Sequence, residues 1–131
     1  MSHPKRMFDP SGERKLWAPD SEEAKALPHT GCVYRITLDG KISVAVPAGD
    51  KRLPGPNGVT VTKLKDGGEG LIMGDFFTGN IVQYQNGKLR VLAKGMRGAD
   101  AVAVGKGVIY VSSWTDGKVW KYESSRPPSG R

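Results

Sequence analysis

The chain has 131 residues, the length of one ordinary domain, and its 18 glycines are about twice the average share. Together with nine prolines this predicts many turns and short elements, and no stretch approaches the ~18 consecutive apolar residues of a membrane helix. The net charge of +7 comes from dispersed basic residues without the interleaved aromatic side chains of a nucleic-acid platform, so we expect neither a membrane nor a nucleic acid as partner.

The amino terminus and the single cysteine bear on the compartment. Residues 1–6 contain no apolar h-region, so no signal peptide is expected and the cytoplasm is the default location. Cys32 is the only cysteine, which excludes an internal disulfide. It falls in a predicted strand, where a small buried side chain is expected rather than a nucleophile.

Residues 1–53 are predicted to form a first unit of strands. Two strands are expected within residues 5–20, and a longer loop follows at residues 21–30. Residues 31–46 then supply two outer strands of the same unit. The Gly- and Pro-rich residues 47–55 cross over to the next unit.

Residues 54–98 hold the complete central unit, in which four short apolar runs are separated by turn signals. Asn86 and Gly87 lie between the third and fourth runs, and both residue types accept the positive φ of a type I′ hairpin turn. The pattern predicts a four-stranded antiparallel meander with strands over residues 59–64, 71–73, 81–84 and 89–93.

Residues 99–123 predict three strands of a further, partial unit, over residues 102–104, 108–111 and 119–122. The second strands, 71–73 and 108–111, are continuously apolar, a pattern typical of strands buried on both faces. The remaining residues, 124–131, are polar and are expected to form a disordered tail.

The units are related by an internal repeat. The segment Gly31-Cys-Val-Tyr-Arg-Ile matches Gly79-Asn-Ile-Val-Gln-Tyr and Gly117-Lys-Val-Trp-Lys-Tyr, and Asn57 aligns with Asp100. Four strands in roughly 40–50 residues is the period of a β-propeller blade, and such blades are stable only when they stack on neighbours. We therefore expect an all-β fold, a partial propeller of about three four-stranded antiparallel meanders that makes half of a six-bladed propeller.

Polar and aromatic residues gather at one face of the expected fold. In a meander, the beginnings of first strands and the loops after second strands lie on the same face. Carboxylate and amide oxygens from successive blades are the ligands that a hard cation such as calcium prefers, whereas Asn-Gly and Asp are also common turn residues. The face is expected to collect Asn57 and Asp100, which each begin a first strand, and a candidate substrate face of Asp75, Phe76, Phe77 and Trp114.

Four segments carry a family resemblance: Pro56-Asn57-Gly58, Met73-Gly-Asp75-Phe-Phe-Thr-Gly79-Asn-Ile, Gly98-Ala-Asp100 and Trp114-Thr-Asp-Gly117-Lys-Val-Trp. Together they look like the gluconolactonase/regucalcin (senescence marker protein) family. The resemblance implies a six-bladed propeller that hydrolyses lactones with one divalent metal, calcium or zinc, in its central channel. It also implies Asn57 and Asp100 as metal ligands and Asp100 as the catalytic base. The family's early-blade Glu ligand and a further substrate-contacting Asn have no counterpart in this chain.

On this basis we expect a metal-dependent hydrolase of a small-molecule lactone or ester that is incomplete as a single chain. Half a propeller exposes two apolar faces, so self-association or a complementary half-propeller is expected, and the isolated half is expected to be inactive. Two alternatives stay open, because a fold does not define a function. One is a non-catalytic NHL-like scaffold that binds a protein or glycan on its channel face, and the other is a strictosidine-synthase-like propeller without a working metal site.

Overall fold

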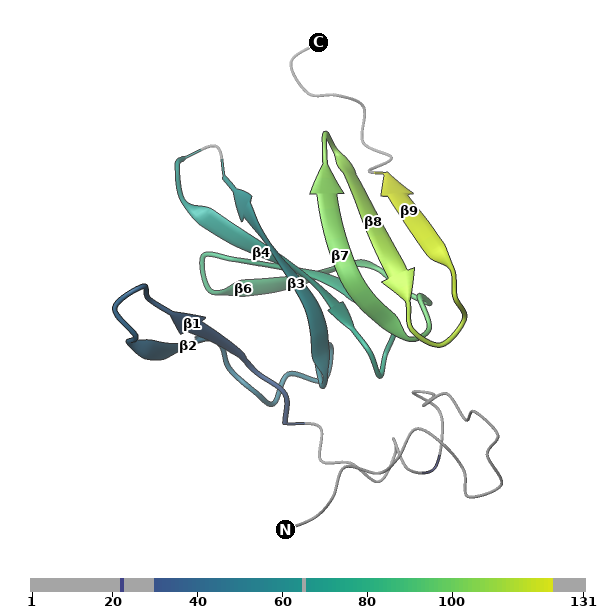
Figure 1. Ribbon diagram of the computed structural model, residues 1–131, viewed down its shortest axis with the longest axis horizontal. Helices are drawn as coiled ribbons and strands as arrows, with labels where there is room; N and C mark the ends of the chain where they lie inside the picture. The colour runs from purple at the N-terminus through teal and green to yellow at the C-terminus, as the bar shows by residue number, and fades with distance from the viewer. Residues whose placement is uncertain (1–21, 23–29, 65, 124–131) are drawn as a thin grey trace.

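The computed structural model describes Glu22 and residues 30–64 and 66–123. Segments 30–64 and 66–123 form nine β-strands and no helix, and the strands make three open antiparallel sheets of two, four and three strands (Figure 1). The expected all-β class is confirmed. No helix in the described part is long and apolar enough to cross a membrane. The strands predicted within residues 5–20, most of the predicted loop at 21–30 and the predicted tail at 124–131 lie outside the described residues.

The first sheet is a hairpin of β1 (Val33–Ile36) and β2 (Ile42–Val46). The Oγ1 of Thr37 accepts a hydrogen bond of 2.9 Å from the Lys41 backbone N–H and closes the turn. Gly40 adopts a φ of 89° there, a conformation that a side chain would disfavour. Within the described residues, no strand pairs with the other edge of β1.

The second sheet contains β3 (Pro56–Lys63), β4 (Glu69–Asp75), β5 (Ile81–Gln85) and β6 (Lys88–Ala93) in sequential order. Each strand pairs antiparallel with the next, which is the predicted meander. Asn86 and Gly87 have φ values of 52° and 74°, as the Asn-Gly signal predicts. β3 begins earlier than predicted because Pro56 still pairs with Asp75 at the end of β4.

The third sheet contains β7 (Ala99–Gly105), β8 (Val108–Ser113) and β9 (Val119–Glu123). The prediction that apolar second strands are buried on both faces is confirmed for β4, where Ile72 and Met73 are 3% and 0% exposed. It is wrong for β8, where Tyr110 is 43% exposed. The reason is that, in the part of the chain that the structure describes, no further sheet covers the side of the third sheet turned away from the second.

The core lies on both sides of the second sheet. Consecutive residues of a strand point to opposite faces, so Ile72 and Met73 of β4 contribute to different apolar clusters. The cluster toward the third sheet has the buried members Ile72, Ile81, Met96, Ala99, Val102, Ile109 and Val111. The cluster toward the first sheet has the buried members Val46, Leu53, Met73 and Val82. The second sheet is therefore the middle layer of a three-sheet stack.

Candidate functional site

Asn57 and Asp100 are the second residues of β3 and β7, the two strands through which the second and third sheets meet (Figure 1). The Asn57 Nδ2 donates a hydrogen bond of 3.3 Å to the carbonyl oxygen of Ala99. The structure thus brings the beginnings of these two strands side by side. Asn57 is exposed and Asp100 is partly buried, so both lie where solvent or a ligand can reach the strand ends.

A glycine makes the close approach of β3 and β7 possible. A Cβ atom on Gly58 would overlap the carbonyl oxygen of Asp100 and lie 2.9 Å from the Cα of Ala101. Two residues further along β3, Thr60 Oγ1 donates a hydrogen bond of 2.5 Å to the Val102 carbonyl oxygen. The backbones of β3 and β7 are therefore in direct contact next to Asn57 and Asp100.

Asp75 ends β4 and is fully buried. Its Oδ1 accepts a hydrogen bond of 2.5 Å from the Gly55 N–H. Its Oδ2 accepts two more from Thr78, from the backbone N–H at 2.7 Å and from Oγ1 at 2.5 Å. The carboxylate therefore joins the β4–β5 turn to the crossover that leads into β3.

The aromatic residues of the predicted substrate face lie in the turns that follow β4 and β8. The Phe76 and Phe77 rings meet edge to face, with centroids 5.6 Å apart and an interplanar angle of 80°. Phe77 packs so closely over Gly55 that a Cβ there would overlap its ring. Trp114 is exposed, and its backbone N–H donates a hydrogen bond of 2.8 Å to the Gly98 carbonyl oxygen.

These contacts place all six predicted site residues at one end of the stack. The backbone N–H of Phe76 donates to the Gly55 carbonyl at 3.0 Å, which ties the turn after β4 to the beginning of β3. The Trp114–Gly98 bond ties the turn after β8 to the beginning of β7 in the same way. Since β3 and β7 meet at their first residues, both turns and both strand beginnings lie at the same end of the stack. We call this end of the stack the edge that carries the predicted site.

The side-chain oxygen atoms of the predicted site residues are too few to hold a metal alone. Asn57 Oδ1 and the Asp100 carboxylate have the chemistry that calcium prefers, but calcium takes about 6–8 oxygen ligands and zinc about four ligands. Both Asp75 oxygens already accept hydrogen bonds from the turn. In residues 22, 30–64 and 66–123, no group of three or more His, Cys, Asp or Glu side chains is placed to hold a metal ion.

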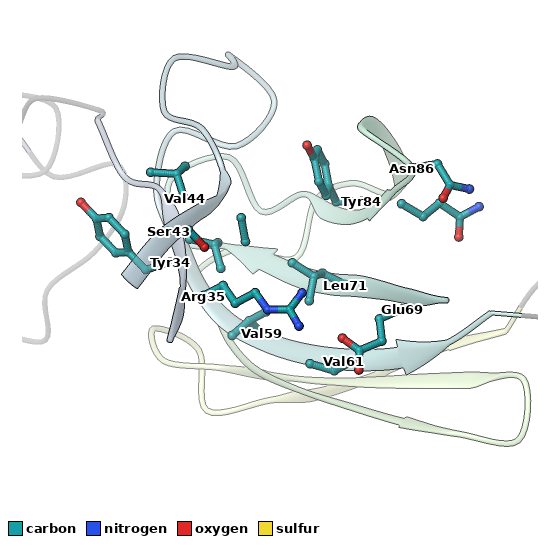
Figure 2. A pocket seen from close by; sticks show the side chains of 13 residues that line it. Tyr34, Arg35, Ser43, Val44, Val59, Val61, Glu69, Leu71, Tyr84 and Asn86 are labelled. Carbon is teal, nitrogen blue, oxygen red and sulfur yellow. The ribbon is translucent and has the colours of Figure 1, made fainter. Parts of the chain in front are cut away.

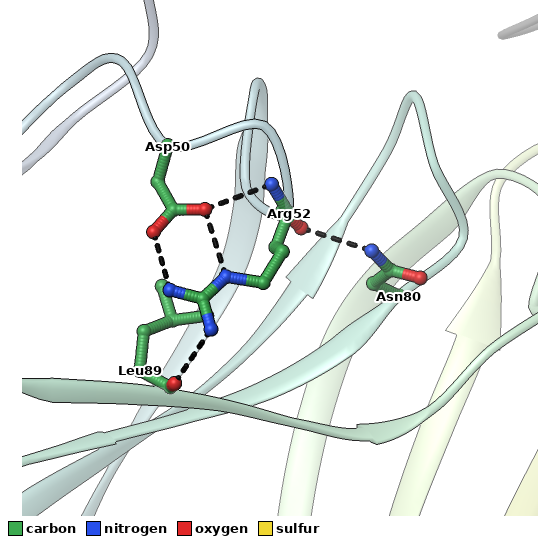
Figure 3. A network of polar contacts seen from close by, with 4 residues as sticks. All are labelled: Asp50, Arg52, Asn80 and Leu89. Atoms are coloured by element: carbon green, nitrogen blue, oxygen red, sulfur yellow. Dashed lines mark hydrogen bonds and ion pairs between the residues drawn. The ribbon is translucent and has the colours of Figure 1, made fainter.

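A second polar cluster, which the sequence did not single out, fixes the crossover that precedes β3 (Figure 3). The Arg52 guanidinium pairs with both oxygens of Asp50, through Nε at 2.9 Å and Nη2 at 2.7 Å. The Nη1 of Arg52 donates a hydrogen bond of 3.0 Å to the Leu89 carbonyl oxygen. The backbone carbonyl oxygen of Arg52 accepts a hydrogen bond of 3.0 Å from Asn80 Nδ2. Hydrogen bonding from Arg52 lowers the pKa of Asp50 to about 2. The spacing Asp-x-Arg in a Gly- and Pro-rich loop is the signal that could have found this cluster.

The structure also shows an open groove of about 540 Å³ between the first and second sheets. We name it the intersheet groove; its lining includes Arg35, Ser43, Val59, Val61, Leu71 and Tyr84. Figure 2 shows the Arg35 side chain pointing from β1 toward β3 and β4, while the Tyr34 ring points away. The sequence could not reveal this groove, because it arises where two sheets of unequal width are stacked.

Comparisons of the chain with protein-family models, with curated proteins and with solved structures found no match.

Proposed function

We propose that the chain is part of a six-bladed β-propeller of the gluconolactonase/regucalcin type, a metal-dependent hydrolase of small lactones or esters. The proposal is supported by the four short segments that resemble this family and by the stacking of three antiparallel sheets. In such an assembly the three sheets are successive blades, and β3 and β7 are inner strands beside the channel.

The observation that carries the proposal is the contact between the strand beginnings that carry Asn57 and Asp100. The two residues are far apart in sequence, yet the Asn57 amide reaches the Ala99 carbonyl next to Asp100, at 3.3 Å. With Nδ2 used in that bond, Oδ1 of Asn57 remains as an acceptor. The amide oxygen and the Asp100 carboxylate are the pair of ligands that the family resemblance implies.

Among the six proposed site residues, Asp100 has the carboxylate that is open to solvent, so it has the chemistry of a general base. A carboxylate that is partly open to solvent can accept a proton from a water molecule that attacks a carbonyl. A divalent cation, when bound, would polarise that carbonyl. Because the described residues supply too few ligands for a cation, we propose that the remaining ligands come from a second copy of the chain or from a complementary half-propeller.

The proposal predicts that the completed assembly is stabilised by calcium or zinc at millimolar concentration. Thermal melting with and without each ion measures the shift, and Asp100→Asn should abolish it together with any lactone hydrolysis. Asp39→Asn is the matched control, because Asp39 is an exposed carboxylate in the β1–β2 turn and should leave the shift unchanged. Absence of any ion-induced shift in the wild-type assembly would contradict the proposal.

A second candidate function is a non-catalytic scaffold that uses the same edge to bind a protein or a glycan. The specific observation in its favour is that both oxygens of the Asp75 carboxylate accept hydrogen bonds from Gly55 or Thr78. Asn57 and Asp100 are then the two oxygen-bearing side chains of the predicted site that remain for a metal. An assembled protein that shows no response to either ion would favour this scaffold role.

A further inference from the structure

The β5–β6 hairpin borders a second groove, of about 520 Å³, that the proposed function does not use. We name it the hairpin groove. All its lining residues come from β5, β6 or the turn between them: Gln83, Gln85, Asn86, Lys88, Leu89 and Arg90. Because one hairpin supplies the whole lining, the groove does not depend on a second copy of the chain.

The polar residues of the hairpin groove lie on the face of the second sheet that is turned toward the third sheet. Gln83 pairs with Ile72, which belongs to the apolar cluster on that side. Residues two apart in a strand share a face, so Gln85 lies on it too. The pairs Gln83–Arg90 and Gln85–Lys88 add the two cations, because paired residues of adjacent strands point to the same face. Among the described residues, none from the third sheet lines the groove.

Each cation of the hairpin groove therefore lies beside an amide. Lys88 and Arg90 are exposed, whereas Gln83 and Gln85 are half-buried. Within the part of the chain that the structure describes, the two cations form no ion pair and the two glutamine side chains form no hydrogen bond. Four neighbouring polar side chains are thus available to a ligand, and the two charged ones favour an anion.

We propose that the hairpin groove binds an extended acidic peptide whose carboxylates lie at alternate positions. Lys88 and Arg90 are two residues apart in β6, so their side chains leave the strand ~7 Å apart. Side chains at alternate positions of an extended peptide have the same spacing, so two carboxylates of the peptide meet the two cations. The amides of Gln83 and Gln85 each offer donors and an acceptor, which match the N–H and C=O groups of the peptide backbone.

Two other roles for the cations fit the hairpin less well. Charged side chains on an edge strand can prevent its pairing with other chains, but Arg52 already covers the β6 edge through its hydrogen bond to the Leu89 carbonyl (Figure 3). A single-stranded nucleic acid would need aromatic rings for base stacking, and the lining of the groove contains none. The peptide therefore docks over the face of the hairpin rather than as an added strand.

The test is the fluorescence anisotropy of a labelled short peptide of alternating glutamate and serine, titrated with the full-length protein. Lys88→Gln combined with Arg90→Gln should weaken binding about tenfold, as expected when two exposed ion pairs are lost. Lys106→Gln combined with Lys118→Gln is the matched control, because both lysines are exposed, lie outside the groove and remove the same charge. The control should change the affinity less than about twofold, since exposed charges outside the groove are screened by salt.

A further variant tests the amides without changing the charge. Gln83→Ala should weaken binding of the alternating peptide about threefold, because one hydrogen-bonding side chain is lost. A second peptide, with the same composition but with its glutamates in one block, tests the spacing. Neighbouring side chains of an extended chain point to opposite sides, so the block peptide should bind more weakly than the alternating one.

Equal affinities for the two peptides, or equal losses in the two double variants, would overturn the proposal, since net charge alone would then explain the binding. Absence of peptide binding would overturn it as well. So would tighter binding of a polyuronate of equal charge, because the partner would then be an acidic polysaccharide. The titration contains no metal and no lactone, so its result is separate from that of the hydrolase proposal.

Discussion

Gly58 is the residue at which the second and third sheets approach most closely. No side chain fits between its Cα and the carbonyl of Asp100, because the obstacle is backbone and cannot rotate away. Gly58 directly follows Asn57 in β3, and the carbonyl that it approaches belongs to Asp100. The absence of a side chain at Gly58 therefore allows β3 and β7 to approach closely beside the two proposed ligands.

Gly58→Ala is predicted to destabilise the protein by more than ~2 kcal/mol, because the two strands must separate to admit a methyl group. Gly105→Ala is the matched control at the other end of β7, where a Cβ would meet no atom within 4 Å. It should change the free energy of unfolding by less than ~0.5 kcal/mol. Urea denaturation compares the two variants, and equal destabilisation would show that the contact of β3 with β7 is not the tight one described.

At the residue scale, the sequence predicted which residues gather at one edge but not how each is used. The placement of Asn57 beside the beginning of β7 follows from the repeat. The three hydrogen bonds to Asp75 could not be anticipated, because its donors come from Gly55 and from Thr78 and depend on the path of the crossover. A sequence pattern identifies a carboxylate but does not say whether its oxygens are already occupied.

At the scale of elements, local signals predicted strands and turns better than they predicted burial. Asn86 and Gly87 have the positive φ values that the hairpin signal demands, since that choice is made within the turn itself. Tyr110 was expected to be buried and is exposed, because its burial depends on a neighbouring sheet rather than on β8. An apolar run therefore indicates that a strand has apolar side chains to bury. Whether they are buried depends on the neighbouring sheets.

The crossover before β3 is held by an ion pair whose contribution depends on pH. The pKa of Asp50 in the folded chain is about 2, below its ordinary value of 3.8, because Arg52 donates hydrogen bonds to its carboxylate. A lowered pKa means that the stabilisation is present above the ordinary value and is lost as the pH falls through the folded value. The pair is partly exposed to solvent, so its contribution is expected to be under ~1 kcal/mol.

Asp50→Asn should therefore reduce the free energy of unfolding near neutral pH and have little effect near pH 2, where the wild-type carboxylate is itself becoming protonated. Urea denaturation of both proteins at about pH 6 and about pH 2 measures the difference. Lys121 and Glu123 form an exposed pair on β9, and Glu123→Gln is the control for general charge effects. If Asp50→Asn and the wild type differed by the same free energy of unfolding at both pH values, the Asp50–Arg52 pair would not hold the crossover.

At the scale of the whole molecule, both end sheets of the described stack carry exposed apolar side chains. The first sheet exposes Tyr34, Ile36, Ile42 and Val44, and the third sheet exposes Tyr110 and Val119. Exposed apolar side chains on the outer faces of end sheets are typical of surfaces that associate. Under the proposal, the outer face of each end sheet packs against the other end sheet of a second copy, which closes a ring with two-fold symmetry.

The mass of the full-length protein in solution, measured by multi-angle light scattering behind a sizing column, tests the half-propeller proposal most directly. We expect a particle of twice the chain mass of 14.1 kDa, which persists at micromolar concentration. A compact, stable monomer of 14.1 kDa would contradict the proposal. Such a monomer would show that the two exposed apolar faces need no partner, and the proposed completion of the Asn57–Asp100 site by a second copy would be lost.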